Sequence, residues 1–434
     1  MSSVRRGAGV AGPAASPGGA ALSVASPGVA SSGGTARPGG AGAGGLARYL
    51  AAATLARAAD GGAVVAIVLL VTTSGGPGWL AGLLGAAITA PHLAGPFIAR
   101  PLDTARDGRT VIAVACLVHG VTLAAAVLLY PYAWPLVTAV LLAASGLVGP
   151  LLTGGISSRL PGIAGPDRRS QRRAQGWDVA TYGIAGTVGP SVVAAVAAWA
   201  SPTVAALVLA VAVIAAAGLI RLLPYAPPAA TRAQAPHPAR TLGLMLSTGP
   251  LRRTLYLTMS VALSVQVLPV VAVASTGTLG VGAAAAGVLT AAYGVGGLAA
   301  SMLIMLRPLP GDADRAMTIL AVTVAAALTL VAVTTTFGAA VAAYAVTGVL
   351  NSYFFAATLA ARSEYAPATA RGQVFVWIGA LKISAGSAGT ALAGTLIGAG
   401  AHLPLLLAVT ATTIAAAVSL ADRSAQRPRF WFQS

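Results

Sequence analysis

The sequence predicts an all-α membrane protein whose twelve transmembrane helices form two related halves of six. Three observations support this fold class. The chain contains twelve apolar runs of roughly 18–27 residues, and about 20 residues of helix cross the hydrocarbon core of a bilayer. Its arginines are concentrated in every second connection between these runs, and short patterns in the first half recur in the second.

The composition excludes the soluble classes of protein. Hydrophobic residues make up 57% of the chain and charged residues 8%, with a mean hydropathy of +0.83, and such values are typical of a membrane protein. The apolar runs lack the alternation of a membrane β-barrel. The net charge of +17 is divided among loops and tails, and no basic helix with interleaved aromatics accompanies it, so we expect no nucleic-acid partner. The excess of Ala, Gly, Val and Arg, with Lys382 as the one lysine, indicates a high-GC genome such as an actinobacterial one.

The apolar runs define the expected helices in chain order. In the first half they are 49–72, 79–99, 110–130, 134–157, 178–199 and 203–223. In the second half they are 254–274, 280–306, 316–335, 338–361, 373–398 and 403–420.

The distribution of charge fixes the expected orientation. Both tails and the connections after the second, fourth, sixth, eighth and tenth runs contain arginines. The alternate connections contain no Arg, Lys, Asp or Glu: 73–78, 131–133, 200–202, 275–279, 336–337 and 399–402. Because cytoplasmic loops retain cationic residues, we expect both termini in the cytoplasm and a multi-pass protein of the inner (plasma) membrane, surrounded by lipid.

The apolar runs and the distribution of charge together predict five segments of the chain. Residues 1–45 are rich in Gly, Ala, Ser and Pro, so we expect a disordered cytoplasmic tail. Two six-helix bundles at 46–223 and 254–421 follow, separated by a cytoplasmic linker at 224–253, whose second part contains leucines between arginines and predicts an interfacial helix. A cytoplasmic tail at 422–434 ends the chain.

The two halves share short patterns at equivalent positions. Arg100-Pro101-Leu102 after the second run recurs as Arg307-Pro308-Leu309 after the eighth. Trp177 and the segment 185–189 recur 200 residues later as Trp377 and 385–389. Two repeated halves around a long cytoplasmic loop are typical of secondary transporters.

The loop after the second run resembles the cytoplasmic signature of the major facilitator superfamily. In the segment 95–109, the residues Asp103, Gly108 and Arg109 match the signature's Asp, Gly and Arg, although Ala99 replaces a Gly and two extra residues separate Asp103 from Gly108. The resemblance covers about 48–421 and implies the major facilitator fold, with a gating role for these three residues.

The fifth run is similar to the Gly-Pro motif of drug/proton antiporters in that superfamily. Gly186, Gly189 and Pro190 are its main residues, and glycines at this spacing allow helices to approach closely. The alternative is that these glycines serve packing alone. The intramembrane Arg expected in the fourth run of such antiporters is missing.

Three charged residues lie well inside the runs: Arg57, Asp60 and Lys382. Charge in hydrocarbon is costly, so each is a functional candidate. Arg57 and Asp60 are three residues apart on one helix face. Either Asp60 exchanges a proton while Arg57 tunes it, or the two form a neutral pair that never titrates. Lys382 is expected to contact an anionic substrate, to pair with Asp60, or to extend to the cytoplasmic surface.

Other polar residues in the runs complete the candidate site. We expect Gln266, Tyr293, Asn351 and Lys382 to line a substrate cavity. His92 and His119 are interpreted as hydrogen-bonded packing residues rather than a proton relay.

The sequence contains no signature of catalysis. It has no metal-spaced His/Cys cluster, no catalytic triad pattern and no nucleotide-binding loop, and its only cysteine is Cys116. We therefore expect no catalytic residue, no metal and no cofactor, and an ion gradient as the energy source. The predicted function is proton-coupled efflux of small apolar or amphipathic compounds such as antibiotics, by a monomer. Proton-coupled import is the alternative, and a non-transporting receptor is a more remote one.

Overall fold

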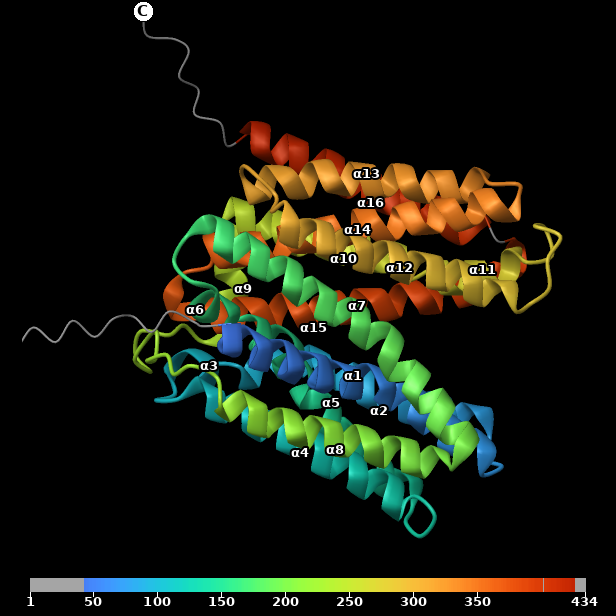
Figure 1. Ribbon diagram of the computed structural model, residues 1–434, viewed down its shortest axis with the longest axis horizontal. Helices are drawn as coiled ribbons and strands as arrows, with labels where there is room; N and C mark the ends of the chain where they lie inside the picture. The colour runs from blue at the N-terminus through green and yellow to red at the C-terminus, as the bar shows by residue number, and fades with distance from the viewer. Residues whose placement is uncertain (1–42, 401, 426–434) are drawn as a thin grey trace, which may run out of the picture. The chain divides into compact units, whose positions relative to one another are not determined.

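The computed structural model describes residues 43–400 and 402–425, which fold into helices joined by short connections (Figure 1). In this part of the chain, 12 helices are long and apolar enough to cross a membrane, and no strand occurs. The predicted all-α fold class is therefore confirmed. The predicted disordered tail lies outside the described residues up to residue 42, as does the C-terminal tail from residue 426.

The first half contains six membrane-length segments, two of which are interrupted. They are built from α1 (Ala43–Thr73), α2 (Gly78–Thr89) with η1 (Ala90–Ile98) and α3 (Pro101–Thr104), α4 (Gly108–Leu129), α5 (Pro135–Pro150) with η2 (Leu151–Gly155) and α6 (Leu160–Ala164), α7 (Arg168–Trp199) and α8 (Pro202–Arg221).

The second half follows the short helix α9 (Pro238–Ser247). Its segments are α10 (Gly249–Val265) with α11 (Leu268–Ser275), α12 (Ala285–Leu306), α13 (Ala313–Val333), α14 (Phe337–Tyr365), η3 (Ala368–Ala370) with α15 (Arg371–Leu396) and η4 (Ile397–Ala399), and α16 (His402–Ala425). The helix α9 occurs where the linker predicted one, while its place at the membrane surface stays a prediction.

Prolines explain the interruptions. Pro96 lies inside the 3₁₀ segment η1, and Pro150 is followed by the π-helical turn η2. A proline removes a backbone donor and clashes with the preceding turn, so it can kink or interrupt a helix, although α7 continues through Pro190.

Each half has its own apolar core. One buried cluster is formed almost entirely by residues from Tyr49 to Leu223, and a second by residues from Leu257 to Ala416. The halves also pack against each other, chiefly where α7 lies along α12. A side chain at Gly176 would meet Met305, and one at Gly183 would meet Leu298. The boundaries predicted for the two bundles remain predictions.

The repeated glycines occupy equivalent places in the two halves. A Cβ at Gly189 of α7 would lie 2.6 Å from the carbonyl oxygen of Ala58 in α1, and a Cβ at Gly389 of α15 would overlap the carbonyl of Leu263 in α10. The contact of α7 with α1 in the first half therefore corresponds to the contact of α15 with α10 in the second half. By contrast, no atom lies within 4 Å of a Cβ at Gly186, so the packing explanation applies to Gly189 and does not extend to Gly186.

Candidate functional site

Arg57 forms a buried ion pair, and its partner is Asp178 of α7. Its Nη1 lies 2.7 Å from Asp178 Oδ1, and the two residues are 3% and 0% exposed. The expected pairing of Arg57 with Asp60 is therefore wrong. Arg57 is directed toward α7, whereas the charged partner of Asp60 comes from η1, so the two side chains leave α1 toward different neighbours.

The carboxylate of Asp178 is fully hydrogen-bonded. Its Oδ1 accepts from the Tyr49 hydroxyl at 2.6 Å and from Arg57, and its Oδ2 accepts from Ser157 Oγ at 2.7 Å. Arg57 also donates to Ser157 and Thr181. A buried ion pair with these extra hydrogen bonds has its desolvation compensated, which indicates a structural role in joining α1 to α7.

Asp60 is held quite differently, beside a histidine. Its Oδ1 lies 3.6 Å from His92 Nε2, the side chain is 10% exposed, and this oxygen has no hydrogen-bond partner. That distance is too long for a hydrogen bond. A Cβ at Gly149 of α5 would lie 2.9 Å from the same oxygen, so the site has no room for a larger residue there.

The two histidines near Asp60 have separate hydrogen-bond partners. His92 Nδ1 lies 3.0 Å from the Ile88 carbonyl oxygen, and His119 Nδ1 lies 2.9 Å from Ser145 Oγ. Nε2 of His119 is buried without a partner. His119 agrees with the expected packing role, whereas His92 and Asp60 form a titratable pair inside the first half.

A second group of charges lies where the halves meet. Lys382 Nζ of α15 is 3.5 Å from the ring centroid of Phe355 in α14 and 5.2 Å from that of Tyr182 in α7. The expected pairing of Lys382 with Asp60 is wrong, because its contacts within the described chain are these aromatic rings. Lys382 is half-buried, so part of its surface stays accessible.

Arg362 accompanies Lys382. It is 1% exposed, and its guanidinium carbon lies 5.8 Å from the ring centroids of both Phe355 and Phe375. It donates to Thr358 Oγ1 at 3.4 Å, while its Nε has no partner. Within the described residues, neither Arg362 nor Lys382 forms an ion pair with a carboxylate.

The contacts that the described chain shows for the other expected cavity residues do not include Lys382. Asn351 Nδ2 donates to the Tyr293 hydroxyl at 2.7 Å, which joins α14 to α12. Gln266 follows α10, and a Cβ at Gly386 of α15 would lie 3.0 Å from the Gln266 side chain. The structure brings Tyr293 and Asn351 together but shows no contact of either with Gln266 or Lys382. Their role in a cavity stays a prediction.

The signature loop connects the two halves through Asp103. Its carboxylate accepts hydrogen bonds from the backbone N–H groups of Gly372 at 2.7 Å and Gln373 at 3.1 Å, at the start of α15. An anion there is favoured by the helix dipole and the free N–H groups. A Cβ at Gly108 would overlap the guanidinium of Arg159, so a larger residue there would require that side chain to move. The gating role of the loop stays a prediction.

Arg109 acts within the first half. It lies 2.9 Å from Asp107, and Arg221 of α8 lies 2.7 Å from the same carboxylate. The hydrogen bond from Arg109 holds the pKa of Asp107 well below its usual range, so this link remains ionised at neutral pH.

Further polar contacts join the halves at the arginine-rich end. Arg172 at the start of α7 lies 2.7 Å from Glu364 at the end of α14, and Arg173 donates to the Met305 carbonyl at 2.9 Å. In Figure 1 the helices of the two halves lie close together near α3, α6 and α9 and diverge toward the ends of α2 and α11.

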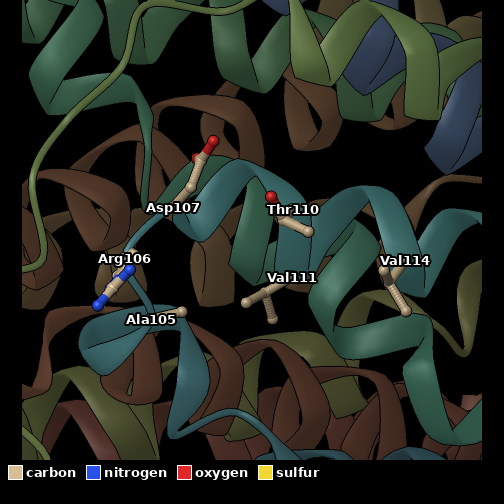
Figure 2. Close-up of a pocket in the computed structure, with 6 residues that line it drawn as sticks. All are labelled: Ala105, Arg106, Asp107, Thr110, Val111 and Val114. Atoms are coloured by element: carbon tan, nitrogen blue, oxygen red, sulfur yellow. The ribbon is translucent and has the colours of Figure 1, made fainter.

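A surface hollow beside the signature loop is not part of this buried site. Figure 2 shows its lining, which comes from one connection and the first turns of α4, with a volume of about 500 Å³. The lining residues are Ala105, Arg106, Asp107, Thr110, Val111 and Val114. None of the buried charged residues in the membrane region borders it.

Sequence reasoning missed Asp178 and Arg362. The fifth segment begins ten residues earlier than expected, since Asp167 caps α7 by accepting from the backbone N–H of Ser170 at 2.8 Å. Aspartate is a preferred N-cap residue, so Asp167 in the sequence indicates the earlier start of this helix. Arg362 was assigned to a loop, yet α14 continues to Tyr365.

Solved structures share this architecture. A bacterial homologue of the iron transporter ferroportin in an outward-facing state aligns with a TM-score of 0.69 and 15% identity, covering 87% of this chain and 99% of that one. The human organic anion transporter MFSD10 aligns with a TM-score of 0.67 and 13% identity, covering 86% and 99%. The major facilitator transporter FucP in its outward conformation aligns with a TM-score of 0.67 and 12% identity, covering 87% and 98%.

No sequence family definition and no curated protein matches the chain. At these identities the likeness concerns the fold alone. The chain is thus a multi-pass membrane protein with the fold of the major facilitator transporters.

Proposed function

We propose that this protein is a secondary transporter that moves a small organic molecule by alternating access and couples that movement to protons. The fold supports the transport part of this proposal, because two related halves that can rock against each other alternate the access to a site between them. The observation that carries the coupling part is the Asp60–His92 pair, a carboxylate and an imidazole 3.6 Å apart inside the first half.

The chemistry of this pair suits proton exchange. The carboxylate oxygen beside His92 has no hydrogen bond in the structure, and because burial of such a group is costly, its retention favours a function. Histidine changes charge near neutral pH. A single proton therefore converts the pair from net negative to neutral, and this change in charge alters the cost of keeping it away from water.

The contacts between the halves suggest which state is described. Asp103 with the start of α15, and Arg172 with Glu364, join the halves at the arginine-rich end. With that end in the cytoplasm, as the positive-inside rule implies, the protein is closed to the cytoplasm, in keeping with the outward states of two aligned structures. Opening to the cytoplasm then requires these contacts to break.

For direction, we propose efflux of amphipathic compounds, including antibiotics, as the Gly-Pro motif in α7 implies. Uptake is the second candidate, because aligned structures include a proton:xylose symporter and a fucose:proton symporter. The aligned proteins carry iron, organic anions or sugars by their descriptions, so the fold does not select the substrate.

Direction is tested in membrane vesicles from cells that produce the protein. Everted vesicles with an acidic interior are incubated with a metabolite mixture, and the accumulated compounds are identified by mass spectrometry against vesicles without the protein. Efflux predicts accumulation that a protonophore abolishes. Accumulation only in right-side-out vesicles with an acidic exterior would replace efflux by uptake, and no protein-dependent accumulation in either would contradict transport.

A further inference from the structure

The charges around Lys382 do not balance. Arg362 faces the same Phe355 ring as Lys382, and Arg57, with Asp178 beside it, faces the same Tyr182 ring. Asp178 is already neutralised by Arg57 at 2.7 Å. Within the described residues, Arg362 and Lys382 are therefore two basic side chains without a carboxylate partner, of which Arg362 is buried and Lys382 half-buried.

Aromatic rings compensate these cations incompletely. Phe355 faces Lys382 at 3.5 Å, and Arg362 lies 5.8 Å from the same ring. A cation–π contact stabilises a desolvated cation by less than the desolvation of a buried ion costs. A negatively charged group between the two cations would supply the missing compensation.

The position of Lys382 makes such a group accessible. Its ring contacts come from α7 in the first half and α14 in the second, so its half-exposed surface lies at the junction of the halves. The surroundings are apolar, because Val179, Ile304, Phe355 and Phe375 form one buried cluster there, with Tyr182 packed against it.

From this geometry we propose that the protein binds a small organic anion, a carboxylate or sulfonate attached to an apolar group, between Lys382 and Arg362. The proposal rests on the proposed transport function and names its substrate class. Lys382 and Arg362 pair with the anionic group, and Tyr182 with its apolar neighbours contacts the rest of the molecule. The anion also links residues of both halves, as a substrate that controls alternating access must.

The test is a binding measurement on the purified full chain in nanodiscs, with three probes of one shape. They are 2-naphthoate, its neutral analogue 2-naphthamide and the cation 2-naphthylmethylammonium, titrated by calorimetry. We expect naphthoate to bind at least about ten-fold more tightly than the amide, as the pairing of one desolvated charge predicts, and the cation to bind weakest.

Substitutions then assign the preference to the site. Lys382→Gln should remove the preference for naphthoate over the amide, and Lys382→Arg should retain it. Arg315, an exposed arginine of α13, provides the matched control, and Arg315→Gln should change neither affinity. Thermal unfolding of each variant confirms that it is folded.

Two results would overturn the proposal. One is equal affinity for naphthoate and naphthamide in the native protein, including no binding of either at millimolar concentration. The other is a preference that survives both Lys382→Gln and Arg362→Gln. Because binding is measured without a gradient, a failure of transport or of proton coupling would leave this result unchanged, so the two proposals fail separately.

Discussion

Arg57 in the first half is held in a different way from Arg362 and Lys382 in the second half. In the first half, Arg57 is paired with Asp178 at 2.7 Å and surrounded by hydroxyl groups. In the second, Arg362 and Lys382 lie against aromatic rings with no carboxylate partner in the described chain. A buried charge with a counter-charge is compatible with a stable fold, and losing that partner destabilises the protein. A buried charge without a counter-charge lowers the free energy of unfolding, so its presence calls for a functional reason. The difference separates a structural network from a candidate binding site.

The largest effect should follow from breaking the compensated pair. Asp178→Asn leaves Arg57 buried without a counter-charge, and we expect a loss of about 3–5 kcal/mol in unfolding free energy. The measurement is denaturant or thermal unfolding of the purified protein. The double variant Arg57→Gln with Asp178→Asn removes both charges and should recover much of the loss.

A control separates this effect from a general loss of carboxylates. Asp167→Asn changes the exposed capping residue of α7, where asparagine also caps well, and should change stability little. If Asp178→Asn unfolds at the native midpoint, the Arg57–Asp178 pair is not the structural link described here.

A smaller effect of opposite sign is expected in the second half. Arg362→Met removes a buried cation that has no carboxylate partner and keeps a flexible apolar side chain. We expect unfolding free energy to stay equal or to rise by about 1–4 kcal/mol, while binding of 2-naphthoate weakens. A strong loss of stability in this variant would show that Arg362 is a structural residue like Arg57, and the contrast between the halves would fail.

The close helix contacts at Gly189 and Gly389 should be equally sensitive to substitution in the two halves. Gly189→Ala and Gly389→Ala place a methyl group against a backbone carbonyl in the same relative position of each half. Overpacking of this kind typically costs about 1–3 kcal/mol. Gly186→Ala, where the added Cβ meets no atom, is the matched control and should be neutral. Unequal costs at Gly189 and Gly389 would mean that the two contacts differ despite the repeat.

The sequence was sufficient for those features that depend on local composition. Hydrophobic runs predicted the twelve segments, and the cost of intramembrane charge singled out Arg57, Asp60 and Lys382. The glycine spacing of the fifth run predicted a close helix contact, which occurs at Gly189 and not at Gly186, and Gly389 makes the equivalent contact in the second half.

The side chains that pair with Arg57 and Asp60 could not be predicted from the sequence, because the pairing depends on which helices become neighbours. Arg57 and Asp60 share a helix face, but their partners Asp178 and His92 come from different segments. The boundary of the fifth segment was placed at Asp178, so this carboxylate was assigned to a helix end. Arg362 is missed in the same way, because the tenth segment ends at Tyr365, four residues beyond the predicted end at residue 361.

The central claim is that the Asp60–His92 pair couples proton movement to transport. Its most direct test is Asp60→Asn, reconstituted in proteoliposomes with the compound that accumulates in vesicles. Since Asp60 is not the partner of Arg57, this substitution leaves no unpaired buried arginine, and it preserves the shape of the side chain. The account predicts that exchange between equal pools continues while accumulation driven by a pH gradient is lost. If Asp60→Asn still concentrates the compound against its gradient, the coupling role of Asp60 is contradicted.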